Sequence, residues 1–222
     1  SKGNFQYGNL EGSYEIDTLR LLTVAFGMYG SNSKNYGDGF TTMYGADHED
    51  IAYSYRTGNH GDGSWYSING NIDYQRTSRK NKQRMITFSY KINTQPQTSN
   101  SNTGYEDIHA KEEVDDLVKR LLLKNSQSDG KTNTMEQTFQ VDYTTPIGEL
   151  HTVEAGAKYI FRRNTSDNKL YEAAGGSDDY LYNEDRSSDY RHLNHILAAY
   201  LGYTLKYKDF TFKPGVRYEQ TV

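Results

Sequence analysis

The sequence predicts an all-β fold: an antiparallel up-and-down meander of about eight long strands, with one short helix in a long connection. Three observations support this prediction. Tyrosine supplies 21 of the 222 residues, with 20 Gly beside it, and aromatic residues favour strands. Apolar and polar residues alternate with a period of two in one stretch after another. The segments between these stretches fall into a short and a long class.

Eight stretches alternate in this way and are predicted as strands. The clearest is 65–77, where Ile68 and Ile72 alternate with Asn69, Asn71 and Asp73. Its Tyr66 and Tyr74 are eight positions apart, which is about 27 Å along a strand and roughly 20 Å after a 40° tilt. That is close to the height of the apolar band of an outer-membrane barrel. In chain order the predicted strands are 22–29, 39–56, 65–77, 86–93, 139–144, 153–162, 197–207 and 210–219.

The connections favour a membrane barrel over a sandwich. Short polar turns are expected at 76–84, 146–149 and 206–209, and long links at 57–64, 95–134 and 164–189. Such alternation is typical of barrels with short periplasmic turns and long extracellular loops. Residues 1–222 therefore read as a single unit, part of a larger transmembrane β-barrel. The residues expected to face lipid are Ile68, Ile72, Phe139, Val141, Ala155, Ala157, Leu197, Leu201 and Val216.

The link 95–134 contains a helical pattern, predicted as an insertion at about 103–125. Thr103 to Glu106 matches a capping box, and Ile108, Val114, Leu117, Val118, Leu121 and Leu122 recur at helical spacing. We expect a helix over about 106–124. Its apolar stripe either packs on its own domain or serves as a lid or partner site.

Composition excludes several other classes. The chain has no cysteine, which excludes disulfide scaffolds, thiolate metal sites and thiol nucleophiles. A net charge of −4 gives no general attraction for nucleic acid, which is not expected as a partner. No apolar run is long enough for a transmembrane helix, and the first residues lack a signal region, so any signal is expected to have been removed.

Several short runs resemble TonB-dependent-receptor-like outer-membrane proteins of the Bacteroidetes type. They are 142–146 (DYTTP), 154–159 (EAGAKY), 215–219 (GVRYE) and 14–17 (YEID). The resemblance implies an energy-coupled nutrient receptor and transporter in the cell outer membrane, surrounded by membrane lipid. It also implies an upstream plug domain, TonB-type coupling and a possible surface lipoprotein partner. Such barrels have about 22 strands, so about eight strands indicate a fragment.

Ligand contacts in such a transporter would come from residues facing the lumen and from aromatic residues near the loops. The candidates are Trp65, Asn69, Asn71, Asp73, Glu154, Lys158, Tyr180, Tyr182 and Arg217. The sequence does not indicate which nutrient is carried. The alternative that remains open is a soluble β-sandwich binding module, using its Tyr residues as stacking platforms for glycans.

No catalytic motif is present, and we expect transport rather than enzymatic activity. The acidic residues could be combined into carboxylate pairs for glycoside hydrolysis, but nothing in the sequence fixes the distance between the two carboxylates. No cofactor or metal is expected. Two clusters of acidic residues could supply oxygen ligands for calcium, but neither has the spacing of an EF-hand. An exposed, solvated surface explains both clusters better. They are Asp47, Glu49 and Asp50, and Asp178, Asp179, Glu184, Asp185 and Asp189.

Overall fold

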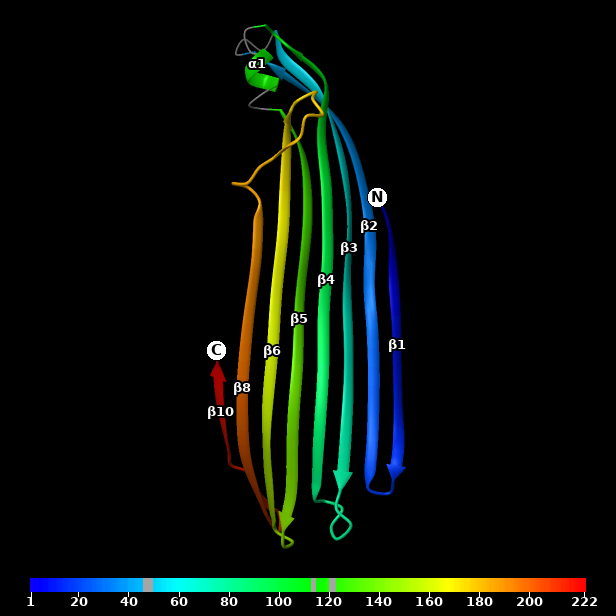
Figure 1. The fold of residues 1–222 in the computed structure, drawn as a ribbon, viewed down its shortest axis with the longest axis vertical. Helices are drawn as coiled ribbons and strands as arrows, with labels where there is room; N and C mark the ends of the chain where they lie inside the picture. Colours follow the sequence, from blue (N-terminus) through cyan, green and yellow to red (C-terminus); the bar gives the residue numbers. More distant parts are fainter. Residues whose placement is uncertain (46–49, 113–114, 120–122) are drawn as a thin grey trace.

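The chain forms one antiparallel sheet in which sequential strands lie side by side (Figure 1). The computed structural model describes residues 1–45, 50–112, 115–119 and 123–222. The strand order is β1-β2-β3-β4-β5-β6-β8-β10, with β7 paired to β6 and β9 paired to β8. The elements are β1 (Lys2–Asp17), β2 (Arg20–Tyr44), β3 (Ile51–Thr77), β4 (Met85–Ala110), α1 (Asp115–Leu117), β5 (Lys124–Ile147), β6 (His151–Ala174), β7 (Leu181–Tyr182), β8 (Ser188–Tyr207), β9 (Phe210–Phe212) and β10 (Gly215–Thr221).

This arrangement confirms the all-β meander. The sheet is open, with β1 at one edge and β10 at the other. A sandwich needs two sheets packed face to face, whereas the strands of the described residues belong to one. The alternative of a soluble β-sandwich is therefore wrong. Among the described residues, no helix is both long and apolar enough to cross a membrane.

The strands are far longer than the alternation predicted. β3 has 27 residues and β4 has 26, whereas about 9–11 residues are enough to cross a bilayer. Segment 57–64 and much of 95–134 and 164–189 are paired strand instead of the predicted loops, as the pairs His60↔Asn102 and Ser99↔Gly130 illustrate. These stretches are polar on both faces, so they show no hydrophobic alternation, yet their backbone hydrogen bonds still form a regular ladder.

Three further strand predictions need correction. Segment 210–219 is not one strand, because Lys213 and Pro214 separate β9 from β10. Segment 39–56 is not one strand, because it contains the end of β2, a connection and the start of β3. β1 was not predicted as a separate strand, although it pairs with β2 along most of its length. Its sequence is rich in Gly, Asn and Glu, which hid the period of two.

The connections are sorted between the two ends of the sheet. The turn end carries the links β1–β2, β3–β4, β5–β6 and β8–β9, at the bottom of Figure 1. Gly148 and Lys208 have positive φ values of 67° and 52° there, as several types of tight turn require. The opposite end, which we call the far end, is where the chain passes from β2 to β3, from β4 to β5 and from β6 to β8. The connections thus alternate between the two ends as predicted, but the predicted sorting by length does not hold throughout: the β2–β3 link, between Tyr44 and Ile51, is no longer than the β3–β4 turn, between Thr77 and Met85.

The cross-strand register gives the sheet two different faces near the turn end. Val24, Ile72, Tyr90, Phe139 and Leu197 lie in one row across the strands. Parallel rows on either side are also mainly apolar, and we call this side the apolar face and the opposite side the polar face. All nine residues predicted to face lipid lie on the apolar face: Ile68, Ile72, Phe139, Val141, Ala155, Ala157, Leu197, Leu201 and Val216.

The apolar rows form a belt of limited height. On β2 the belt runs from Arg20 to Met28, and on β3 from Arg76 to Ile68. Eight steps of about 3.4 Å, tilted by about 40°, give a height of roughly 21 Å. That matches the apolar band of a transmembrane barrel, which is about 25 Å tall. The strands continue beyond this belt toward the far end as polar ribbons.

Within the described residues, the helix predicted over 106–124 is found as α1 (Asp115–Leu117). β4 continues through Ala110, so the helix start expected near Glu106 is wrong, and the capping-box residues from Thr103 belong to the strand. Pairing with β3 outweighs the local capping signal. The β3–β4 register shifts in this region, and Asp107 there has a φ of 51°. The apolar residues Val114, Leu121 and Leu122 lie outside the described residues.

The end of the helix packs on its own domain, which was one of the two expected readings. Val118 is 0% exposed and lies in a small core with Leu123 and Ala173. The Asn125 side chain accepts a hydrogen bond from the Tyr105 N–H at 2.8 Å and donates one to the Ser177 carbonyl at 3.0 Å. The Gly175 N–H also donates to the Lys119 carbonyl at 2.9 Å, so the connection after β4 is joined to the connection after β6 at the far end.

Candidate ligand-contact face

The predicted contact residues of β3 all project from the polar face. Trp65, Asn69, Asn71 and Asp73 occupy alternate positions and so point to one side, opposite to Ile72. The Asn71 amide donates a hydrogen bond to Asp73 Oδ2 at 2.7 Å. This part of the strand presents amide and carboxylate groups at the height of the apolar belt.

A second group of candidates lies several strands away. Glu154 and Lys158 are on β6 and Arg217 is on β10. Neighbouring strands are about 4.8 Å apart, so β6 lies roughly 14 Å from β3 and β10 lies roughly 24 Å from it. The structure therefore places the candidates in two separate groups on the polar face.

Ion pairs occupy two charged members of this second group. Lys213 Nζ lies 3.1 Å from Glu154 Oε2, and Arg217 donates to Glu219 Oε2 at 2.7 Å. Within the described part of the chain, Lys158 has no ion pair. These pairs give the polar face fixed charges of both signs, a surface that suits a water-filled interior.

Trp65 is the centre of an aromatic cluster that the sequence did not reveal. Its ring centroid lies 5.9 Å from that of Tyr29, edge to face, and 6.4 Å from that of Phe5. Phe5, Ser31 and Trp65 lie in one cross-strand row, just beyond the belt on the far-end side. A hollow of about 300 Å³ adjoins Trp65 and Tyr29; its other lining residues are Tyr66, Ser67, Gln95, Pro96, Gln97, Thr132 and Thr134.

This hollow combines flat aromatic surface with amide and hydroxyl groups. Such a combination can bind a ligand through stacking and hydrogen bonds together. Alternation alone would have placed Tyr29 and Trp65 on the polar face. Their contact also depends on the β2–β3 register, which the sequence could not supply.

Tyr180 and Tyr182 lie at the far end, away from both groups. Tyr182 is in β7, with its ring centroid 5.5 Å from that of Tyr171. Tyr180 is in the preceding connection, where partial burial, helped by the charge of Asp178, raises the pKa of its phenol. These two residues belong to the outer rim of the sheet and not to the polar face at belt height.

A hydrogen bond spanning three strands was also not predicted. The Tyr200 hydroxyl on β8 passes over Gly156 on β6 and donates to Asp142 Oδ1 on β5. A Cβ atom at Gly156 would overlap the Tyr200 ring and approach the Asp142 carboxylate. Glycine is therefore required at this position, and the bond ties β5 to β8 on the polar face beside Arg217.

The acidic residues that the structure describes do not form a cluster for a metal. Asp47 and Glu49 lie outside the described residues. Across the residues that are described, no group of three or more His, Asp or Glu side chains is placed to hold a metal ion. Asp178, Asp179, Glu184 and Asp185 lie in the 175–187 connection, and Asp189 lies in β8.

A sheet of long antiparallel strands, with an apolar belt on one face and polar groups on the other, defines the wall of a membrane β-barrel. The comparisons with known proteins agree. Residues 77–222 match the model of the outer membrane protein beta-barrel family. The chain belongs to this family, which places it in the outer membrane.

Solved structures show the same fold. A structure of the RagAB peptide transporter matches 99% of this chain with a TM-score of 0.58 and 11% sequence identity. The RagAB peptide importer in its closed-closed state matches 99% with a TM-score of 0.55 and 12% identity. In both cases the chain covers 28% of the other protein. None of the curated proteins matches the sequence.

Proposed function

We propose that this chain forms part of the barrel wall of a nutrient receptor and transporter in the outer membrane, of the TonB-dependent type. The observation that carries the proposal is the open sheet, whose polar face is lined with amides, ion pairs and the Trp65 cluster. Eight strands closing on themselves would fill their interior with side chains. An open wall with charged inner groups suits a wider barrel that encloses water and a plug.

The similarity to the RagAB transporter supports the transport role. It also motivates three finer proposals: an upstream plug domain, energy coupling through TonB, and a surface lipoprotein that covers the far end. The described parts of the connections after β4 and after β6, joined by the hydrogen bond from the Gly175 N–H to the Lys119 carbonyl, offer a rim for such a partner. We propose transport without enzymatic activity, because the family that matches is one of outer-membrane barrels and the similar solved structures are of transporters.

Uptake by cells that express the full-length protein tests this proposal. Cells are given a labelled oligopeptide mixture, and uptake is measured with and without an uncoupler of the proton gradient. We expect uptake to require the gradient. Uptake that is unaffected by the uncoupler would contradict TonB-type coupling, and no uptake above that of a deletion strain would contradict transport of peptides.

The Trp65 cluster is tested in the same assay. Trp65→Ala should lower uptake at least tenfold, because it removes the stacking surface, whereas Trp65→Phe should retain most of it. Phe40→Ala is the matched control, since Phe40 is an exposed aromatic residue of β2 on the opposite face. Equal loss with Phe40→Ala would show that the effect does not come from the polar face.

A further inference from the structure

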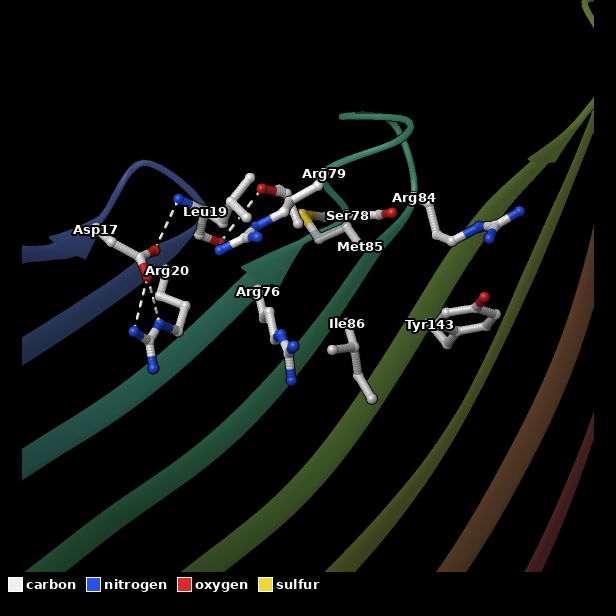
Figure 2. A pocket seen from close by; sticks show the side chains of 11 residues that line it. Asp17, Leu19, Arg20, Arg76, Ser78, Arg79, Arg84, Met85, Ile86 and Tyr143 are labelled. Carbon is white, nitrogen blue, oxygen red and sulfur yellow. Dashed lines mark hydrogen bonds and ion pairs between the residues drawn. The ribbon is translucent and has the colours of Figure 1, made fainter.

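Arginine residues gather on the apolar face at the turn end of the sheet. Arg20, Arg76, Ile86 and Tyr143 follow one another in a single row across β2, β3, β4 and β5, as Figure 2 shows. This row is the last one of the apolar belt. Two arginines are thus placed on the side of the sheet that carries Ile72 and Val24, next to apolar and aromatic side chains.

A third arginine extends the group. Arg84 comes just before β4, and its Nε donates to Thr145 Oγ1 at 3.0 Å. Thr145 is two positions beyond Tyr143 on β5, so it projects from the same face. Arg20, Arg76 and Arg84 adjoin an open depression of about 650 Å³, which Arg79 also lines.

Positive charge in this depression is only partly neutralised. Asp17 is the one carboxylate among its lining residues, and it pairs with Arg20 at 2.7 Å. Within the described part of the chain, Arg76 and Arg79 have no ion pair. The adjoining turn adds Lys80 and Lys82 and no acidic residue, so basic residues outnumber acidic ones around the depression.

The height of the group in the membrane indicates which anion it would meet. The row lies two rows from the centre of the belt, or about 10 Å along the barrel axis. Short turns of such barrels face the periplasm, so this is the level at which acyl chains give way to headgroups in the inner leaflet. Tyrosine is typical of that level, and Tyr143 occupies it here.

We propose that Arg20, Arg76 and Arg84 bind the phosphate of a glycerophospholipid in the periplasmic leaflet. Guanidinium groups donate paired N–H bonds to phosphate oxygens and are well suited to this role. Ile86 and Tyr143 then contact the glycerol and the upper acyl chain. A soluble anion or an acidic protein is a poorer occupant, because lipid covers the face from which these arginines project.

Native mass spectrometry of the full-length protein in detergent tests the proposal. The probes are phosphatidylglycerol and diacylglycerol, which differ in the phosphate. We expect phosphatidylglycerol to bind more tightly, and Arg76→Gln and Arg84→Gln each to weaken it about fivefold, which corresponds to ~1 kcal/mol per basic residue near a lipid surface. Equal binding of the two lipids would overturn the proposal.

Arg56→Gln is the matched control. Arg56 lies on the same strand and on the same side as Arg76, but in the ribbon beyond the belt. It should leave lipid binding unchanged, and a loss equal to that of Arg76→Gln would show a general charge effect and overturn the assignment.

Two further measurements keep the test independent of whether the variants fold. Raising the salt concentration should weaken phosphatidylglycerol binding to the unmodified protein, since the attraction between the charges is screened. Glycerol phosphate and inorganic phosphate should not displace the bound lipid at millimolar concentration. Full displacement would identify a site for free anions, and salt-independent binding would exclude recognition of the phosphate; either result would overturn the proposal.

Discussion

An arginine at position 72 should destabilise the barrel through exposure to lipid. Ile72 lies in the central row of the belt, about 10 Å from each edge along the barrel axis. Its side chain is 46% exposed, so its replacement leaves little cavity and the cost is mainly that of placing a charge in hydrocarbon. We expect Ile72→Arg to lower the free energy of unfolding by about 2–4 kcal/mol.

Two other variants calibrate this value. Asn71→Arg, on the polar face, should change stability by no more than about 0.5 kcal/mol, because Asp73 lies next to it and can pair with the new charge. Leu201→Arg is on the apolar face but in the last row of the belt, where the cost should fall to about 0–1 kcal/mol.

Urea titration of the full-length barrel in phospholipid vesicles, followed by fluorescence, measures all three variants. The expected order of destabilisation is Ile72→Arg, then Leu201→Arg, then Asn71→Arg. If the substitutions at 71 and 72 cost the same, the assignment of the two faces is wrong. If those at 72 and 201 cost the same, the belt has been placed at the wrong height.

Three further predictions concern local features. Val118→Ala should increase hydrogen exchange of the amides in 175–187 through a local loss of about 1–3 kcal/mol, whereas Leu117→Ala, at a side chain that is 47% exposed, should leave that exchange unchanged. Gly156→Ala should cost about 1–3 kcal/mol in urea titration by displacing the Tyr200 hydroxyl from Asp142, and Gly12→Ala, where a Cβ would meet no atom within 4 Å, should not. Because the folded state raises the pKa of Tyr180 above 10.0, its contribution to stability is complete below pH 10 and is lost as the pH rises through the folded value. Tyr180→Phe should abolish this contribution to the pH dependence of stability. It should also remove one phenol that ionises at high pH from the ultraviolet titration of the full-length protein, and an unchanged titration would contradict the raised pKa of Tyr180.

The sequence predicted the fold class and the two faces because lipid imposes a pattern on one side of each strand. Ile68 and Ile72 alternate with Asn69 and Asn71 for that reason. Beyond the belt both faces of a ribbon meet water, and polar residues are acceptable at every position. Residues 97–104 therefore resembled a loop, although they pair with β3 and β5.

For the candidate site, the sequence could predict which face of the sheet the residues occupy but not which residues of other strands they contact. Period-two alternation places Trp65, Asn69 and Asp73 on one side of β3, and the register agrees. Which residues of other strands they meet depends on pairing across the sheet, and no local pattern encodes this. Phe5 beside Trp65 and Tyr200 above Gly156 are contacts of this kind.

The polar ribbons have a consequence for how the barrel is assembled. β3 continues past Trp65 to Ile51, and β4 past Gln97 to Ala110, so these residues must be carried through the hydrocarbon to reach the outer surface. A peptide group without a hydrogen-bond partner costs several kcal/mol in that environment. We therefore expect each pair of strands joined at the far end, β2–β3, β4–β5 and β6–β8, to translocate as a ribbon that is already hydrogen-bonded. Protease protection during insertion would show the two strands of a pair becoming accessible together, whereas one strand crossing before the other would contradict this order of events.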